Sequence, residues 1–170
     1  MRGKIISGYQ GVGKSTLAKS NNNYVDLESS TFFVEGVRDP NWHIVYINIA
    51  EHLALSGLNV FISAHKIVRD ELIKRNSIQK ILVYPSLDLK DIWVSNLKER
   101  YIGTLNTNEE QKNYKAFICA KERYSEDIQK LIESDGFDKH YIIKEIPFNL
   151  EYILNDTDSL NSLMHFWAIL

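Results

Sequence analysis

Short apolar runs alternate along the chain with longer segments in which apolar residues recur every three or four positions. The first pattern is typical of strands that are buried on both faces, and the second of helices that cover them. Strands that alternate with helices predict an α/β fold with a five-stranded parallel sheet and helices on both of its faces. The expected strands are residues 4–7, 24–27, 59–63, 80–84 and 141–146.

Capping signals mark the ends of the expected helices. Asp39 is expected to be the N-cap of the first long helix, which Gly57 ends. In the longest helix, Thr107 and Glu110 match a capping box, and Gly136 follows the last turn. Further helices are expected over about 65–75 and 88–101, with a last one capped by Asp156 or Thr157. The apolar stripes expected to face inward are Trp42, Val45, Ile49 and Leu53 in the first helix, Ile92, Trp93 and Leu97 in the helix over 88–101, and Tyr114, Phe117, Ile118, Tyr124, Ile128, Leu131 and Ile132 in the longest.

Length and charge narrow the range of functions. With 170 residues, the chain is expected to form a single domain, 1–170, with a buried core. Its formal net charge of −2 gives no basis for general nucleic-acid binding or for attraction to an anionic membrane. The apolar tail 165–170 is too short to span a bilayer, so no membrane association is expected. This tail could pack on its own domain or on a second copy, which leaves a homodimer open.

The cysteine content indicates the compartment. Cys119 is the only cysteine in the chain, so an internal disulfide framework is excluded and a reducing cytoplasm is expected. On an apolar helix face, Cys119 is expected to be an inert part of the core. No leader segment is expected, because the first strand begins at Lys4.

The most informative segment follows the first expected strand. Residues 8–16 read GYQGVGKST, the G-x-x-x-x-G-K-S pattern of a phosphate-binding loop. The glycines let the backbone turn tightly, Lys14 supplies charge for the β- and γ-phosphates, and the Ser15 hydroxyl can ligate Mg²⁺. A Gly-rich turn could match by chance, but the strand before it and the helix after it favour ATP and Mg²⁺ as cofactors. The residues expected to bind the nucleotide are Gly8, Gly11, Val12, Gly13, Lys14, Ser15 and Thr16.

Two carboxylates are expected near this loop, because ligands of parallel α/β sheets bind beyond the carboxyl ends of the strands. Asp26 and Glu28 follow the second expected strand, whereas the third strand ends in Ser63. Motor and switch ATPases usually carry an Asp where Ser63 stands, and the chain has no Asn/Thr-Lys-x-Asp segment for reading guanine. These features argue against a switch GTPase and against a helicase-like ATPase.

The layout resembles the nucleoside monophosphate kinase superfamily: an N-terminal P-loop, an acidic residue after strand two, a basic helix after strand three, and an arginine-bearing lid before a long helix. Residues 61–72, FISAHKIVRDEL, look like the gluconate-kinase counterpart, in which a Ser-Ala dipeptide ends strand three and the next helix contributes an arginine. Residues 97–100, LKER, look like the start of the lid, expected over about 100–107. The whole chain also resembles small kinase-like proteins of phages and prophages of Gram-positive bacteria.

The resemblance implies a three-layer P-loop NTPase fold with a short lid. It also implies a phosphotransferase that moves the γ-phosphoryl group of ATP to a small acceptor, with a nucleoside or deoxynucleoside monophosphate as the leading candidate. A hydroxyl acceptor, such as a sugar acid or a nucleoside, is an alternative, and so is a nucleotide-binding regulatory module with little turnover. The Asp-Gly and Pro-Arg turn that usually ends strand three in monophosphate kinases is absent, so their acceptor pocket does not transfer residue by residue.

Three residues are candidates for catalysis. Lys14 and Arg100 would steady the γ-phosphoryl group, although Arg100 could instead favour the dipole of its helix. Asp26 would orient or deprotonate an acceptor hydroxyl, or hold Mg²⁺ with Ser15, although it could instead cap the following turn.

The acceptor is expected to bind within about 26–75. Arg69 could bind a phosphate or carboxylate bidentately or form a surface ion pair, and His65 could touch the substrate or cap a helix. Arg123 could reach the phosphates from the longest helix. The side chains expected to contact the acceptor are Glu28, Arg38, His65 and Arg69. The aromatic candidates for stacking a base are Phe32, Phe33 and Trp42, of which Trp42 also suits the core.

Overall fold

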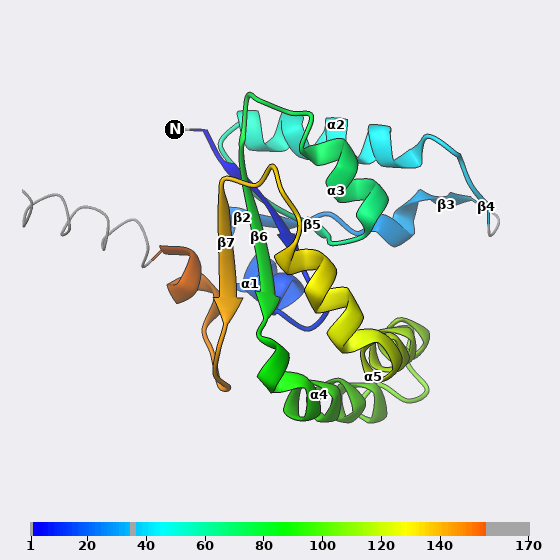
Figure 1. Ribbon diagram of the computed structural model, residues 1–170. Helices are drawn as coiled ribbons and strands as arrows, with labels where there is room; N and C mark the ends of the chain where they lie inside the picture. Colours follow the sequence, from blue (N-terminus) through cyan, green and yellow to red (C-terminus); the bar gives the residue numbers. More distant parts are fainter. Residues whose placement is uncertain (1, 35–36, 156–170) are drawn as a thin grey trace, which may run out of the picture.

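The computed structural model describes residues 2–34 and 37–155, and its centre is a parallel sheet (Figure 1). Its strands lie in the order β2-β5-β1-β6-β7, and every neighbouring pair runs parallel. The five-stranded parallel sheet expected from the sequence is therefore confirmed, and each strand lies within a few residues of its expected position. The strands are β1 (Lys4–Gly8), β2 (Tyr24–Asp26), β5 (Asn59–Ser63), β6 (Gln79–Pro85) and β7 (Lys139–Ile143).

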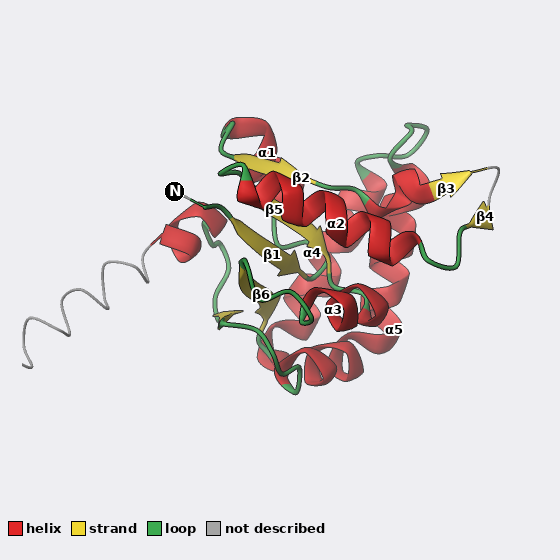
Figure 2. Ribbon diagram, turned by 90° about the horizontal axis from the view of Figure 1, so that it is seen from above, coloured by secondary structure: helices red, strands yellow, loops and turns green. Residues whose placement is uncertain are grey.

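Helices fill the connections between the strands, as Figure 2 shows. They are α1 (Lys14–Ser20), α2 (Trp42–Leu55), α3 (Lys66–Leu72), α4 (Lys90–Ile102) and α5 (Glu110–Ile132). Residues 150–155 are also helical, whereas the expected cap at Asp156 or Thr157 lies outside the described residues. An antiparallel hairpin, which the sequence patterns did not predict, lies between β2 and α2; its strands are β3 (Phe33–Val34) and β4 (Val37–Arg38).

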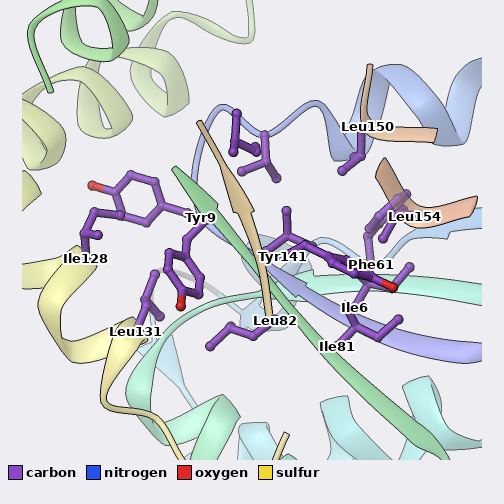
Figure 3. Close-up of a cluster of buried hydrophobic side chains, with 14 of the residues drawn as sticks. Ile6, Tyr9, Phe61, Ile81, Leu82, Ile128, Leu131, Tyr141, Leu150 and Leu154 are labelled. Carbon is purple, nitrogen blue, oxygen red and sulfur yellow. The ribbon is translucent and has the colours of Figure 1, made fainter. Parts of the chain in front are cut away.

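Alternation along the strands divides the core between the two faces of the sheet. Ile5 and Val60 are register partners on one face and belong to the buried cluster formed with α2 and α3. Ile6 and Phe61 are partners on the other face and belong to the cluster formed with α1, α5 and the helical residues 150–155 (Figure 3). This is a three-layer fold of the P-loop NTPase type, with α4 beyond the carboxyl end of β6 (Figure 1).

The buried face of α2 differs from the expected stripe. Val45 and Ile49 are 51% and 39% exposed, whereas Tyr46, Ile47 and Ala50 are fully buried. Apolar residues surround this helix, so the spacing alone fits more than one inward face. Packing against the sheet selects the face that carries Tyr46, because its hydroxyl finds partners at the strand ends.

The start of α5 and several expected core positions are also corrected. The helix begins at Glu110 instead of Thr107; the Thr107 hydroxyl accepts a hydrogen bond from the Glu109 N–H, and the Glu110 carboxylate accepts one from the Asn106 N–H. The capping interactions are therefore displaced by one residue from the expected box. The expected core residues that are exposed in α4 and α5 are Ile92, Tyr114 and Ile132.

No helix in the described part of the chain is long and apolar enough to cross a membrane.

The Tyr46 hydroxyl joins the two strand ends that border the phosphate loop. It donates to the Leu27 carbonyl oxygen over 2.6 Å and accepts from the Ser63 N–H over 3.1 Å. The ring is fully buried, and burial raises the pKa of the hydroxyl, so the group stays protonated and can serve as this donor. One side chain thus fixes the ends of β2 and β5 relative to each other.

We expect Tyr46→Phe to lower the free energy of unfolding by about 1–3 kcal/mol, because it leaves a buried carbonyl and a buried N–H without this partner. Urea denaturation measures the change. Tyr152→Phe is the matched control, because Tyr152 is 64% exposed. Equal effects of the two substitutions would contradict the role given to Tyr46.

Candidate nucleotide and acceptor site

The loop between β1 and α1 has the backbone geometry that a phosphate-binding turn requires. Gly11 and Gly13 have φ angles of +88° and +91°, a region that disfavours residues with a side chain. Gly8 lies against the loop itself: a Cβ there would sit 2.9 Å from Val12 Cγ2. The three glycines of this loop therefore each meet a steric need, two of backbone conformation and one of space.

Trp93 of α4 holds the loop from the outside. Its indole N–H donates to the Gln10 carbonyl oxygen over 3.0 Å, and its ring stacks on Phe148 with 5.7 Å between the ring centres. A Cβ on Gly11 would approach Trp93 Nε1 to 3.1 Å and Leu97 Cδ2 to 3.2 Å. The sequence predicted Trp93 as a core residue but gave no sign of this contact with the loop.

Lys14 lies at the centre of a group of charges. Its ammonium group donates to the Gly8 carbonyl oxygen over 2.6 Å and to that of Tyr9 over 3.3 Å. Burial lowers the pKa of Lys14 to about 8; the carboxylates of Asp26 and Glu28 oppose this change, and the positive charges of Lys112 and Arg100 add to it. The positive charge of Arg100, at the last turn of α4, therefore reaches Lys14.

Ser15 and Asp26 meet beside this lysine. The Ser15 hydroxyl, at the start of α1, donates a hydrogen bond to the Asp26 carboxylate at the end of β2. A hydroxyl and a carboxylate are the hard oxygen donors that Mg²⁺ prefers, and Mg²⁺ usually completes its shell with water and substrate phosphates. Among the described residues, no group of three or more His, Cys, Asp and Glu side chains could hold a metal ion. The donor set of Ser15 and Asp26 thus fits a magnesium ion brought by a nucleotide.

The loop after β2 is tied to α5 and to α2. The Glu28 carboxylate forms an ion pair with Lys112 in α5. Arg38 donates to the Ser29 carbonyl oxygen over 2.7 Å, and its guanidinium lies 4.1 Å above the Trp42 ring. Neither Glu28 nor Arg38 lines the pocket of about 710 Å³ between α3 and α5, although both were expected near the acceptor.

A pocket of about 710 Å³ opens from the phosphate loop and runs between α3 and α5. Gly8, Tyr9 and Lys14 lie at its inner end, together with residues 63–65 after β5. The Ser63 hydroxyl there is buried and has no hydrogen-bond partner within the described ranges. Because buried hydroxyls are rarely left unpaired, this group can serve a ligand in the pocket.

Arg69 forms part of the α3 wall of the pocket. Its side chain is only 9% exposed, and Nη1 donates to the Ala64 carbonyl oxygen. Burial lowers the pKa of Arg69, and the carboxylates of Asp70 and Asp127 oppose this effect. Asp70, a neighbour that could have formed a surface ion pair with Arg69, pairs with Lys66 instead.

His65 lies beside Arg69, at the start of α3. Its side chain makes no capping hydrogen bond and lines the pocket. Burial within the pocket lowers its pKa, and the charges of Arg38, Lys14 and Arg69 lower it further. The lowered pKa favours the neutral ring, in which one nitrogen can donate to a ligand and the other can accept from it.

The α5 wall carries three residues of mixed chemistry. Arg123 Nη2 lies 3.6 Å from Cys119 Sγ, and Asp127 is one turn further along the helix. Cys119 is half-buried at this wall, so its expected place in the inert core is wrong. Its apolar helix face is shared between the core and the pocket. The sequence patterns did not single out Asp127. Its negative charge raises the pKa of His65 and of Arg69 across the pocket.

Two of the three aromatic residues proposed for base stacking pack in or against the core. The Phe32 and Trp42 rings are 6.1 Å apart; Trp42 belongs to the buried cluster that includes α2, and Phe32 packs against it. The side chain of Phe33 lies outside the described part of the structure. A second hollow, of about 300 Å³, lies between α1 and residues 148–151, with Gly13 and Thr16 on its wall.

Comparison of the sequence with models of known protein families and with curated proteins found no match. The chemistry of the site is therefore inferred from its geometry.

We expect a pKa of about 8 for Lys14, readable by nuclear magnetic resonance from the titration of its ε-carbon. Asp26→Asn should lower this pKa, because a compensating negative charge is lost. Lys112→Met should raise it, because a like charge is lost, whereas Lys115→Met on the same helix should leave it unchanged. Shifts of the same sign in the first two variants would contradict the arrangement of charges.

Proposed function

We propose that the protein is an ATP-dependent phosphotransferase that moves the γ-phosphoryl group to a small acceptor, most simply a nucleoside or deoxynucleoside monophosphate. The observation that carries the proposal is the hydrogen bond between Ser15 and Asp26 beside Lys14, at the inner end of a pocket that contains Arg69. A donor site for Mg·ATP and a separate pocket with a cationic wall are the two parts that phosphoryl transfer requires.

On the donor side, the loop would hold the triphosphate through its N–H groups and through Lys14. Ser15 and Asp26 would hold Mg²⁺, which neutralises charge on the phosphates during transfer. The hollow between α1 and residues 148–151 begins at Gly13, next to the phosphate loop, and is the natural place for the base of the nucleotide. Lys14 touches both sides of the site, since it belongs to the loop and also lines the acceptor pocket.

On the acceptor side, the pocket volume of about 710 Å³ falls in the range of small-molecule sites and suits a mononucleotide. The guanidinium of Arg69 can hold an anionic group of the acceptor, and Arg123 can add a second positive charge from the opposite wall. Arg100, whose charge reaches Lys14, would stabilise the charge that builds up on the transferring phosphoryl group. Positioning and charge neutralisation together supply most of what this reaction needs.

One observation favours a hydroxyl acceptor as a second candidate. Asp127 lines the pocket, and its charge acts on Arg69 across it. A carboxylate in this place could accept the proton of an attacking hydroxyl, a role that a phosphate acceptor does not need. A carboxylate-bearing sugar would use Arg69 and Asp127 at once.

The test is a coupled assay of ADP release with Mg·ATP across ribo- and deoxyribonucleoside monophosphates, nucleosides and sugar acids. We expect turnover that depends on one acceptor class and falls by about 10³-fold or more in Lys14→Ala and in Arg100→Gln. Arg69→Gln should raise KM for the acceptor more than it lowers kcat. Lys115→Met, on the exposed side of α5, is the control. Slow hydrolysis that no acceptor stimulates would contradict the kinase and favour a regulatory module.

A further inference from the structure

We propose that Lys112 binds the phosphates of the donor nucleotide and that Glu28 holds Lys112 in the free protein, so that nucleotide binding replaces one partner of this lysine with another. The inference rests on the proposed function, because it requires a polyphosphate beside Lys14. It adds a residue that neither the P-loop motif nor the lid arginine includes.

The ion pair between Lys112 and Glu28 joins two distant parts of the chain. Lys112 is in the first turn of α5, directly after the lid segment, and Glu28 lies 84 positions earlier, two residues beyond Asp26. Both side chains are partly exposed, 45% for Lys112 and 36% for Glu28. The pair is therefore a surface contact and not part of the core, so it can open without unfolding the domain.

The surroundings of the pair call for an anion. The charges of Lys112 and Arg100 both lower the pKa of Lys14, and those of Asp26 and Glu28 both raise it. Two further cations thus lie within electrostatic range of Lys14, with two carboxylates to balance them. A triphosphate carries more negative charge than Glu28. Because the positive charges near Lys14 repel it, replacing Glu28 with a triphosphate as the partner of Lys112 is favourable.

The chemistry of lysine suits an exchange of partners. Its ammonium group has three donors on a flexible four-carbon stem, so a small rotation of the stem can turn it from one acceptor to another. Lys112 also lies 3.8 Å from Glu109, which keeps it near the lid when Glu28 is released.

The strength of the pair sets the size of the effect. A partly exposed ion pair shifts an equilibrium by a factor of about 1.4 to 5. We take this factor as the ratio of paired to unpaired Lys112 in the free protein. Competition from Glu28 then raises the apparent Kd for ATP by a factor of one plus that ratio, which is about two- to sixfold. A charged hydrogen bond from Lys112 to a phosphate should strengthen binding by about tenfold or more. The two residues are expected to act on the same affinity in opposite directions.

The experiment is calorimetric titration with Mg·ATP at fixed ionic strength, on the wild type, Lys112→Met, Glu28→Gln and the double variant. We expect Kd to rise about tenfold or more in Lys112→Met and to fall about two- to sixfold in Glu28→Gln. In the Lys112→Met background, Glu28→Gln should give no such gain, because the lysine for which Glu28 and the phosphates compete is already absent. Lys115→Met, an exposed lysine one turn along the same helix, should leave Kd unchanged.

Three results would overturn the proposal. The first is a Kd that rises no more in Lys112→Met than in Lys115→Met, because Lys112 would then have a structural role only. The gain in Glu28→Gln could persist in the Lys112→Met background, which would reduce Glu28 to a general repulsion of phosphate. Finally, a wild type that binds no Mg·ATP would overturn the proposed function together with the exchange, whereas normal binding with unaffected variants would overturn the exchange alone.

Discussion

Lys14 carries its ammonium group among two backbone carbonyls, two carboxylates and two further cations, and this balance determines what the site can bind. Burial alone lowers the lysine's pKa toward neutrality. The carboxylates of Asp26 and Glu28, after β2, oppose this lowering of the pKa. The negative charge of a polyphosphate would stabilise the protonated form of Lys14 further. The surroundings that lower the pKa of the free lysine therefore favour an anionic ligand.

The rest of the fold keeps these groups in place. The parallel sheet brings the ends of β1, β2 and β5 to one edge, and the Tyr46 hydroxyl fixes β2 against β5. The hydrogen bond from Trp93 to Gln10 holds α4 against the phosphate loop. In this position the last turn of α4, with Arg100, lies within electrostatic range of Lys14. Helices α3 and α5 then form the walls of the pocket that begins at this edge. The pocket between α3 and α5 and the hollow beside α1 thus both border residues of the loop after β1.

Local patterns in the sequence were enough for the sheet and for the phosphate loop, because both depend on neighbouring residues. Apolar runs define the strands, and the G-x-x-x-x-G-K-S motif marks the turn, in which Gly13 has a positive φ angle. The inward face of α2 was wrong because its apolar residues surround the helix, and only contact with the sheet selects Tyr46 over Val45.

Contacts between distant segments were beyond the reach of the sequence. The pair of Glu28 and Lys112 spans 84 positions, and the place of Asp127 opposite Arg69 depends on how α5 lies across the pocket. A carboxylate or lysine on a helix face looks like ordinary surface in the sequence. Cys119 was assigned to the core for the same reason, since periodicity does not show which part of an apolar face borders a pocket.

The most direct test of this account is the affinity for ATP measured with and without Mg²⁺, in the wild type and in Asp26→Asn. The account predicts that the wild type binds ATP and that Mg²⁺ strengthens the binding, whereas Mg²⁺ adds little in Asp26→Asn because its ligand set is broken. An equal gain from Mg²⁺ in both proteins, or no binding of ATP by the wild type, would contradict it.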